Sequence, residues 1–191
     1  MGKELRPGFY LAVEEPGLFT AVLPNLAERF PCYAIVRNPL SVMTSSRTGR
    51  WAKKTADKPP AAVRYDEGLV RHLSGARDPL ESNFRRIDYF FRRFQQELPA
   101  SHILRYEDIV ESGGRALKVI VPPARELDEP LQSRNANSLY DRDFMLRCGE
   151  RLLKSEGAYW DFYPKESVET LLAELERTGG AYNDRTGASR E

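Results

Sequence analysis

The sequence predicts an α/β domain in which a mostly parallel sheet is flanked by helices. Short apolar runs with β-branched members at 9–13, 32–36 and 102–106 are typical of buried strands. A helical segment separates the first two runs, and this β-α-β unit favours parallel pairing. With 191 residues, of which 41% are hydrophobic and 10% aromatic, the chain fits one domain that can bury a core.

The first half of the chain alternates strands and helices. The segment 18–30 is predicted to be helical because apolar residues recur every four positions, at Leu18, Val22, Leu26 and Phe30. Pro24 should bend or interrupt this helix. After the strand 32–36, Asn38 is a good N-cap and Pro39 suits the first helical position. The polar stretch 47–65 has no clear period and is predicted to be a long loop.

The second half begins with a strong helix signal. Asp78, Pro79 and Glu81 combine an N-cap, a first-turn proline and a capping-box acid, which predicts a helix to about Leu98. Its buried stripe should contain Phe84, Ile87, Phe91 and Phe94, with Arg85, Arg86, Arg92 and Arg93 mainly off it. The remaining predictions are a strand at 102–106, helical turns broken by Gly113 and Gly114, an irregular segment at 121–137, helices at 141–155 and 164–177, and a frayed tail at 179–191.

Composition excludes several classes of function. The 29 basic and 28 acidic residues nearly balance, so no overall charge favours nucleic acid. The basic clusters at 47–58 and 85–93 are consistent with a solvated loop and a solvated helix face. Cys32 and Cys148 are expected to be reduced thiols, and no metal site is expected. Neither a signal peptide nor a run of about 18 apolar residues occurs, so we expect a cytoplasmic protein.

Arg37 stands where a predicted strand ends and a helix begins. Anions bind at such places in open α/β sheets, because backbone N–H groups point at the ligand, and a guanidinium is suited to phosphate. Ser45, eight residues on, could offer a hydroxyl to the same anion. The alternatives are that Arg37 pairs with a carboxylate such as Glu107 or Asp108, and that Ser45 bonds to its own backbone.

The segment from Arg37 to Ser45 resembles the 3′-phosphate-binding motif of sulfotransferases that use 3′-phosphoadenosine 5′-phosphosulfate. In that family a strand ends in Arg-Asn-Pro or Arg-Asp-Pro, and a serine follows eight residues after the arginine. The segment 102–110 similarly resembles the family's strand and Tyr-Glu-Asp sequence, so Tyr106 would lie near the adenine. The resemblance covers roughly residues 10–175 and implies a fold related to P-loop nucleotide hydrolases. It also suggests that Arg134, next to Asn135, approaches the phosphate from a later loop.

One part of the family pattern has no counterpart in this sequence. The family begins with a strand and a Gly/Ser/Thr-rich loop that cradles the 5′-phosphosulfate, and no strand followed by such a loop occurs here. We therefore expect a single domain over 1–191 that lacks the first strand and the phosphate loop, and that self-associates or pairs with another chain through its exposed sheet edge. The alternative to a sulfotransferase is then a non-catalytic remnant, acting as a binding or interaction module or as half of a two-chain enzyme.

The general base and the acceptor are the least defined parts of this prediction. Family members place the base roughly 22 residues before the arginine, where this chain has Glu15; a solvated acidic turn is the alternative for that residue. The acceptor would be a hydroxyl or an amine. The basic loop 47–58 is compatible with a glycan or a lipid head group.

Overall fold

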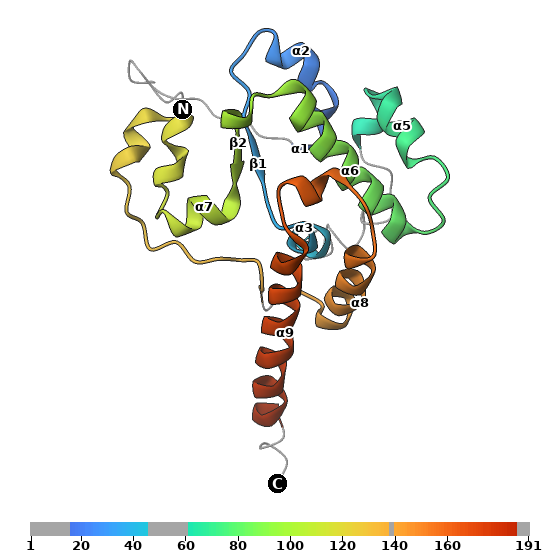
Figure 1. The fold of residues 1–191 in the computed structure, drawn as a ribbon, viewed down its shortest axis with the longest axis vertical. Helices are drawn as coiled ribbons and strands as arrows, with labels where there is room; N and C mark the ends of the chain where they lie inside the picture. The colour runs from blue at the N-terminus through green and yellow to red at the C-terminus, as the bar shows by residue number, and fades with distance from the viewer. Residues whose placement is uncertain (1–15, 46–60, 138–139, 187–191) are drawn as a thin grey trace, which may run out of the picture.

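The computed structural model describes residues 16–45, 61–137 and 140–186. Helices dominate this part of the chain, and Figure 1 shows them arranged around two short strands near its centre. In chain order the elements are α1 (Pro16–Ala21), α2 (Leu23–Ala27), β1 (Ala34–Val36), α3 (Pro39–Ser45), η1 (Ala61–Arg64), α5 (Glu67–Leu73), α6 (Pro79–Glu97), η2 (Ala100–His102), β2 (Ile103–Arg105), α7 (Tyr106–Glu111), η3 (Arg115–Val119), η4 (Pro122–Glu126), α8 (Arg142–Leu153), η5 (Ala158–Asp161) and α9 (Lys165–Thr186).

The described sheet consists of β1 and β2, which pair in parallel. Ala34 aligns with Ile103 and Val36 aligns with Arg105. This confirms the parallel arrangement of the predicted strands 32–36 and 102–106, and with it a general α/β class. The predicted strand 9–13 lies outside the described residues.

Both strands are shorter than predicted. Before β1 a side-chain hydrogen bond stands where backbone pairing was expected, and after β2 a helix begins at once. Before β1, the Cys32 carbonyl accepts a hydrogen bond from the His102 ring Nδ1 at 2.9 Å, in place of a backbone ladder. The His102 ring also stacks on Tyr33, with 4.4 Å between the ring centroids. At the other end, Tyr106 is already the first residue of α7.

The main core lies between the sheet and the helices α3, α6, α8 and α9. Figure 1 shows α3 and α6 on one side of the strands, with α7 on the other, and α9 projecting beyond the rest of the described chain. The core is built from buried side chains of β1, of these helices and of the segment at η5: Val36, Leu40, Met43, Phe84, Ile87, Phe91, Met145, Cys148, Leu152, Ala158, Tyr159, Tyr163, Val168, Leu171 and Leu175. Cys148 and the half-buried Cys32 are both free thiols, as expected.

Helix α6 follows the prediction closely. The Asp78 carboxylate accepts the backbone N–H of Glu81 and caps the helix, which ends at Glu97. Of the predicted stripe, Phe84, Ile87 and Phe91 are buried, and Phe94 is partly buried against the same core. The apolar period and the cap act locally, so they position this helix without tertiary information.

The basic cluster at 85–93 is not simply a solvated face. The Arg93 guanidinium lies 2.8 Å from the Asp66 carboxylate, and the two side chains are only 17% and 6% exposed. The Tyr89 hydroxyl donates to the same carboxylate. Because Asp66 also caps α5 through the backbone N–H of Leu69, this buried pair attaches α5 to α6.

The predicted helix 18–30 is two short helices. Helix α1 ends at Ala21 and α2 begins at Leu23, with Val22 between them in a non-helical conformation. Pro24 explains the break, because it has no N–H for the carbonyl of Thr20 and its ring crowds that carbonyl. The loss of that bond separates α1 from α2 at Val22, two residues before the proline.

Helix α9 continues past residue 179, where the sequence predicts a frayed tail, and ends at Thr186. Residues 46–60, which include most of the predicted loop and its basic cluster, lie outside the described part of the chain. Among the described helices, none combines the length and apolar character needed to cross a bilayer.

We expect Leu40→Ala to lower the free energy of unfolding by about 2–5 kcal/mol, the usual cost of truncating a fully buried leucine. Leu40 is 0% exposed between β1 and the helices that cover it. Chemical denaturation measures this cost. Ile35→Ala is the matched control, since Ile35 is 54% exposed on β1 and its loss should cost about 0.5 kcal/mol or less. Equal costs for the two variants would contradict the observed burial.

Candidate anion-binding site at the carboxyl ends of the strands

Arg37 and Tyr106 meet at the carboxyl edge of the sheet. Each is the first residue after its strand, and the parallel register aligns the residues immediately before them. The Arg37 guanidinium carbon lies 4.7 Å from the centroid of the Tyr106 ring. This cation–π contact joins two residues that the sequence singled out separately, 69 positions apart.

The hydrogen-bond partners of Arg37 are neutral. Its Nε donates to Asn135 Oδ1 at 2.7 Å, and its Nη2 donates to the Tyr140 hydroxyl at 3.2 Å. In the described part of the chain no carboxylate pairs with Arg37, so the sequence alternative of a direct partner in Glu107 or Asp108 is wrong for this structure. The half-buried guanidinium therefore keeps a positive charge that no described side chain neutralises directly.

Glu107 lies beside this site and connects four parts of the chain. Its Oε1 accepts the backbone N–H of Asn38 at 3.1 Å and the Nδ2 of Asn135 at 2.8 Å. Its Oε2 accepts the Tyr163 hydroxyl at 2.6 Å. The side chain of Glu107 thus reaches the connection between β1 and α3, the segment after η4 and Tyr163, which lies two residues before α9.

The pKa values of this cluster follow from burial and hydrogen bonding. Burial raises the pKa of the Glu107 carboxyl, but the hydrogen bonds from Tyr163, Asn135 and Asn38 outweigh it and hold the pKa below its ordinary value of 4.5. Burial and the adjacent Glu107 carboxylate raise the pKa of the Tyr163 phenol well above its usual range. Glu107 is therefore ionised, and Tyr163 is a neutral donor, at neutral pH.

Glu107 also changes the expected role of the α3 N-terminus. The Asn38 N–H is taken by Glu107, the Leu40 N–H is taken by the Asn38 side chain at 3.0 Å, and Pro39 has no N–H. Two of the backbone donors that the sequence offers to a ligand, those of Asn38 and Leu40, are thus occupied within the protein. The guanidinium of Arg37 is the cationic group that this edge offers to an anion.

The segment at 134–135 is attached to the same place. The backbone N–H of Arg134 donates to the Tyr106 hydroxyl at 3.0 Å, and the Ser41 hydroxyl donates to the Asn135 carbonyl at 3.1 Å. Arg134, which the sequence suggests as a second cation, is exposed at the rim of the site. Asn135, its neighbour, makes the contacts to Arg37 and Glu107.

The other two residues expected at the site are placed differently. Ser45 is the last residue of α3, about 10 Å along the helix axis from its start beside Arg37. Its hydroxyl donates to the Val42 carbonyl at 2.9 Å. This is the hydrogen bond to its own backbone that the sequence analysis gives as the alternative to phosphate binding. The structure therefore brings Arg37, Tyr106 and Arg134 together, while Ser45 lies at the far end of α3 and bonds to its own helix. Glu15 lies outside the described residues.

Tyr140 and Tyr163 are site residues that the sequence does not reveal. They contact Arg37 and Glu107 across separations of 103 and 56 positions. A tyrosine between an irregular segment and a helix carries no pattern that indicates such a contact. Asn135 is signalled only through its position beside Arg134.

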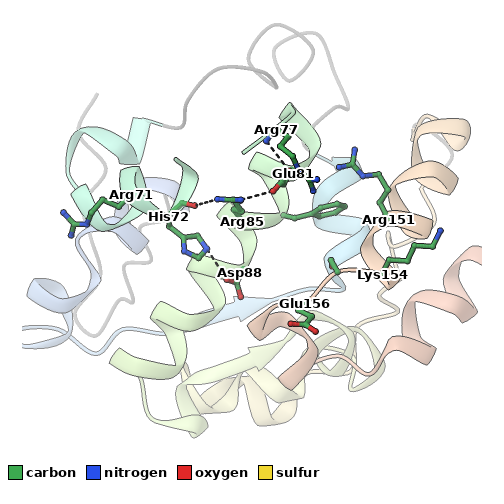
Figure 2. Close-up of a pocket in the computed structure, with 11 residues that line it drawn as sticks. Arg71, His72, Arg77, Glu81, Arg85, Asp88, Arg151, Lys154 and Glu156 are labelled. Carbon is green, nitrogen blue, oxygen red and sulfur yellow. Dashed lines mark hydrogen bonds and ion pairs between the residues drawn. The ribbon is translucent and has the colours of Figure 1, made fainter. Parts of the chain in front are cut away.

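A separate cavity of about 680 Å³ lies between α5, α6 and α8. Its walls are strongly charged, and Figure 2 shows Arg77, Glu81 and Arg85 close together, with Arg151 and Lys154 contributed from the other wall. The lining residues are Arg71, His72, Arg77, Glu81, Phe84, Arg85, Asp88, Arg151, Lys154, Ser155 and Glu156.

The arginines of this cavity are largely engaged within the protein. Glu81 accepts from Arg77 at 2.8 Å and from Arg85 at 2.9 Å, and Arg85 also donates to the carbonyl of Ser74. Arg151 binds both oxygens of Asp78, the residue that caps α6. These contacts attach the loop after α5 and the end of α8 to the start of α6, so we interpret the cluster as a structural brace.

Comparison with known proteins gives no relative: no family model, no curated protein and no solved structure matches this chain. Among the described residues there is also no group of three His, Cys, Asp or Glu side chains placed to hold a metal ion. Inference about function therefore depends on the geometry of the site at Arg37 and Tyr106.

We expect Glu107 to stabilise the fold above pH 4.5 and to lose this effect on acidification. Its folded-state pKa is depressed, so its contribution is present above the unfolded value of 4.5 and disappears as the pH falls through the folded value. Glu107→Gln should lower the free energy of unfolding by about 1–3 kcal/mol at neutral pH, and should change it less below pH 4.5. Denaturant titrations over this range measure both effects. The exposed Glu111 of the same helix is the control, and Glu111→Gln should leave the pH dependence unchanged.

A similar argument applies to the brace. Hydrogen bonds from Arg77 and Arg85 lower the pKa of Glu81 to about 2 from an ordinary 4.5, so its stabilising effect should be lost between these two pH values. Glu81→Gln should flatten the fall in melting temperature over that range. Glu150→Gln, an exposed change on α8, should leave it steep, and an unchanged slope in Glu81→Gln would contradict the brace.

Proposed function

We propose that this protein binds the 3′-phosphoadenosine part of 3′-phosphoadenosine 5′-phosphosulfate at the carboxyl edge of β1 and β2. The observation that carries the proposal is the Arg37 guanidinium, which is stacked on Tyr106 and has only neutral hydrogen-bond partners among the described residues. A positive charge held in place but not paired is what an anionic ligand requires. Its place at the end of a parallel strand is where open α/β sheets bind nucleotides.

Arg37 supplies the contact to the phosphate. Its Nε–H is engaged by Asn135 and one Nη2 proton by Tyr140, and the remaining N–H groups are available to two phosphate oxygens. A second cation supports the same role, because the backbone of Arg134 is bound to the Tyr106 hydroxyl and its side chain is exposed beside the ring.

Tyr106 supplies a surface for the base. The ring is half-exposed, with Arg37 over one face, and the exposed part of the ring is the surface on which adenine would stack. Stacking tolerates any base, and selectivity for a 3′-phosphorylated nucleotide would then come from Arg37. This division of roles agrees with the resemblance that the sequence bears to sulfotransferases at both residues.

The reaction that such binding serves is sulfuryl transfer to a hydroxyl or an amine. The bond between sulfur and the 5′-phosphate oxygen breaks, a bond from sulfur to the acceptor forms, and 3′-phosphoadenosine 5′-phosphate leaves. The acceptor proton passes to a base, for which Glu15 remains the sequence candidate. An acceptor with a glycan or lipid head group remains part of the proposal. Binding without transfer would instead identify the chain as a nucleotide-binding module.

We expect 3′-phosphoadenosine 5′-phosphate to bind, and Arg37→Ala to weaken this binding by about 1.5–3 kcal/mol, the usual value of a charge-assisted hydrogen bond. Adenosine 5′-phosphate, which lacks the 3′-group, should lose little affinity on the same change. Titration calorimetry of both ligands measures the difference. Arg37→Lys should recover only part of the loss, because lysine cannot make the bidentate contact.

The control is Arg125→Ala, which removes an exposed arginine of η4 that pairs with its neighbour Glu126. It should leave the affinity for both nucleotides unchanged. If neither nucleotide binds, or if both lose affinity equally in Arg37→Ala, the proposed role of Arg37 is wrong. Labelled donor with a panel of hydroxyl and amine acceptors then separates an enzyme, which transfers the label, from a module, which binds without transfer.

A further inference from the structure

We propose that Glu107 and Asn135 are positioning residues that fix the guanidinium of Arg37 for its ligand without neutralising it. This inference rests on the proposed function, in which Arg37 binds an anion. It concerns a chain of three side chains, in which Glu107 holds the Asn135 amide and the amide holds Arg37.

The two neighbours of Asn135 determine which way its amide faces. Its Nδ2 donates to Glu107 Oε1 at 2.8 Å, and its Oδ1 accepts from Arg37 Nε at 2.7 Å. An ionised carboxylate only accepts and a guanidinium only donates, so the reversed amide would place like groups together on both sides. The orientation of Asn135 is therefore fixed by charge.

Glu107 is itself anchored in the core. Tyr163, which is 1% exposed, donates to its Oε2, and the Asn38 backbone donates to its Oε1. Asn38 is also buried, and its side chain donates to the Ser167 carbonyl of α9 at 3.3 Å. The carboxylate thus has contacts to the ends of β1 and α9 that hold it in one position.

As a consequence, the guanidinium plane of Arg37 is held in one orientation and the group keeps its positive charge. With Nε held by Asn135, Nη2 by Tyr140 and the face on Tyr106, the guanidinium does not need to be ordered when a ligand arrives. A carboxylate at position 135 would also accept from Nε, but it would set an oxygen against Glu107 Oε1 and would neutralise Arg37. The amide therefore keeps the Glu107 carboxylate apart from Arg37. At the same time it holds the guanidinium in the orientation that Glu107 fixes for the amide.

The experiment has one readout in the ligand-free protein and one with ligand. The first is the hydrogen-exchange rate of the Arg37 Nε–H, measured by ¹⁵N NMR with the resonance assigned through Arg37→Lys. The second is the dissociation constant of 3′-phosphoadenosine 5′-phosphate from calorimetry. The variants are Asn135→Ala, Glu107→Gln and Asn135→Asp in the Glu107→Gln background, with thermal melting to confirm that each is folded.

Asn135→Ala should increase the exchange rate and the dissociation constant by about tenfold each, because one hydrogen bond to a charged group is lost. Glu107→Gln keeps an oxygen acceptor but loses the charge, so both increases should be smaller. Asn135→Asp in the Glu107→Gln background, where an amide faces the new carboxylate, should keep exchange slow, because the carboxylate accepts from Nε, yet should weaken nucleotide binding most. A purely structural role for Asn135 would not separate the two readouts in this way.

The control is Glu129→Gln, an exposed change on the same irregular segment, which should alter neither readout. Unchanged exchange in Asn135→Ala or in Glu107→Gln would overturn the positioning role, even if the nucleotide binds. Tight nucleotide binding in this double variant, Asn135→Asp with Glu107→Gln, would overturn the requirement for a neutral spacer. If the exchange rates change as expected but the wild-type protein binds no nucleotide, the positioning of Arg37 stands and the proposed function fails.

Discussion

The carboxylate of Glu107 is the contact on which the arrangement of the site depends. It accepts hydrogen bonds from the backbone of Asn38, the amide of Asn135 and the hydroxyl of Tyr163, and so joins β1, the segment before α8 and the start of α9 to the end of β2. A two-stranded sheet is too small to hold these parts by backbone pairing. A half-buried anion with three donors supplies the directional contacts that apolar packing does not, and removing it would leave those donors without a partner.

The protein treats its arginines in two different ways. Those of the α5–α6–α8 cavity are paired with nearby carboxylates, as Arg85 is with Glu81 and Arg151 with Asp78, and Arg93 is paired with the buried Asp66. Their charges are satisfied internally and hold helices together. Arg37 is held just as firmly, but by an amide, a hydroxyl and a ring. This contrast, more than the number of basic residues, distinguishes the candidate site from the brace.

The occupation of the α3 N-terminus by Glu107 limits how an anion can bind. In many α/β nucleotide sites the backbone N–H groups of a helix start carry much of the contact. Here Glu107 and the Asn38 side chain engage those of Asn38 and Leu40. A ligand at this edge would therefore depend more on side-chain cations, and above all on the geometry of Arg37.

The sequence by itself determined the elements whose signals are local. The cap and apolar stripe of α6 and the strand–Arg37–helix connection were predicted from spacing and composition, because they depend on neighbouring residues. A mostly parallel sheet was predicted from the order of strands and helices along the chain. Only the tertiary structure decided what surrounds Arg37. Its contacts with Asn135 and Tyr140 span 98 and 103 positions, and that of Glu107 with Tyr163 spans 56. No periodicity encodes such separations; the packing of α8 and α9 against the sheet brings these side chains together.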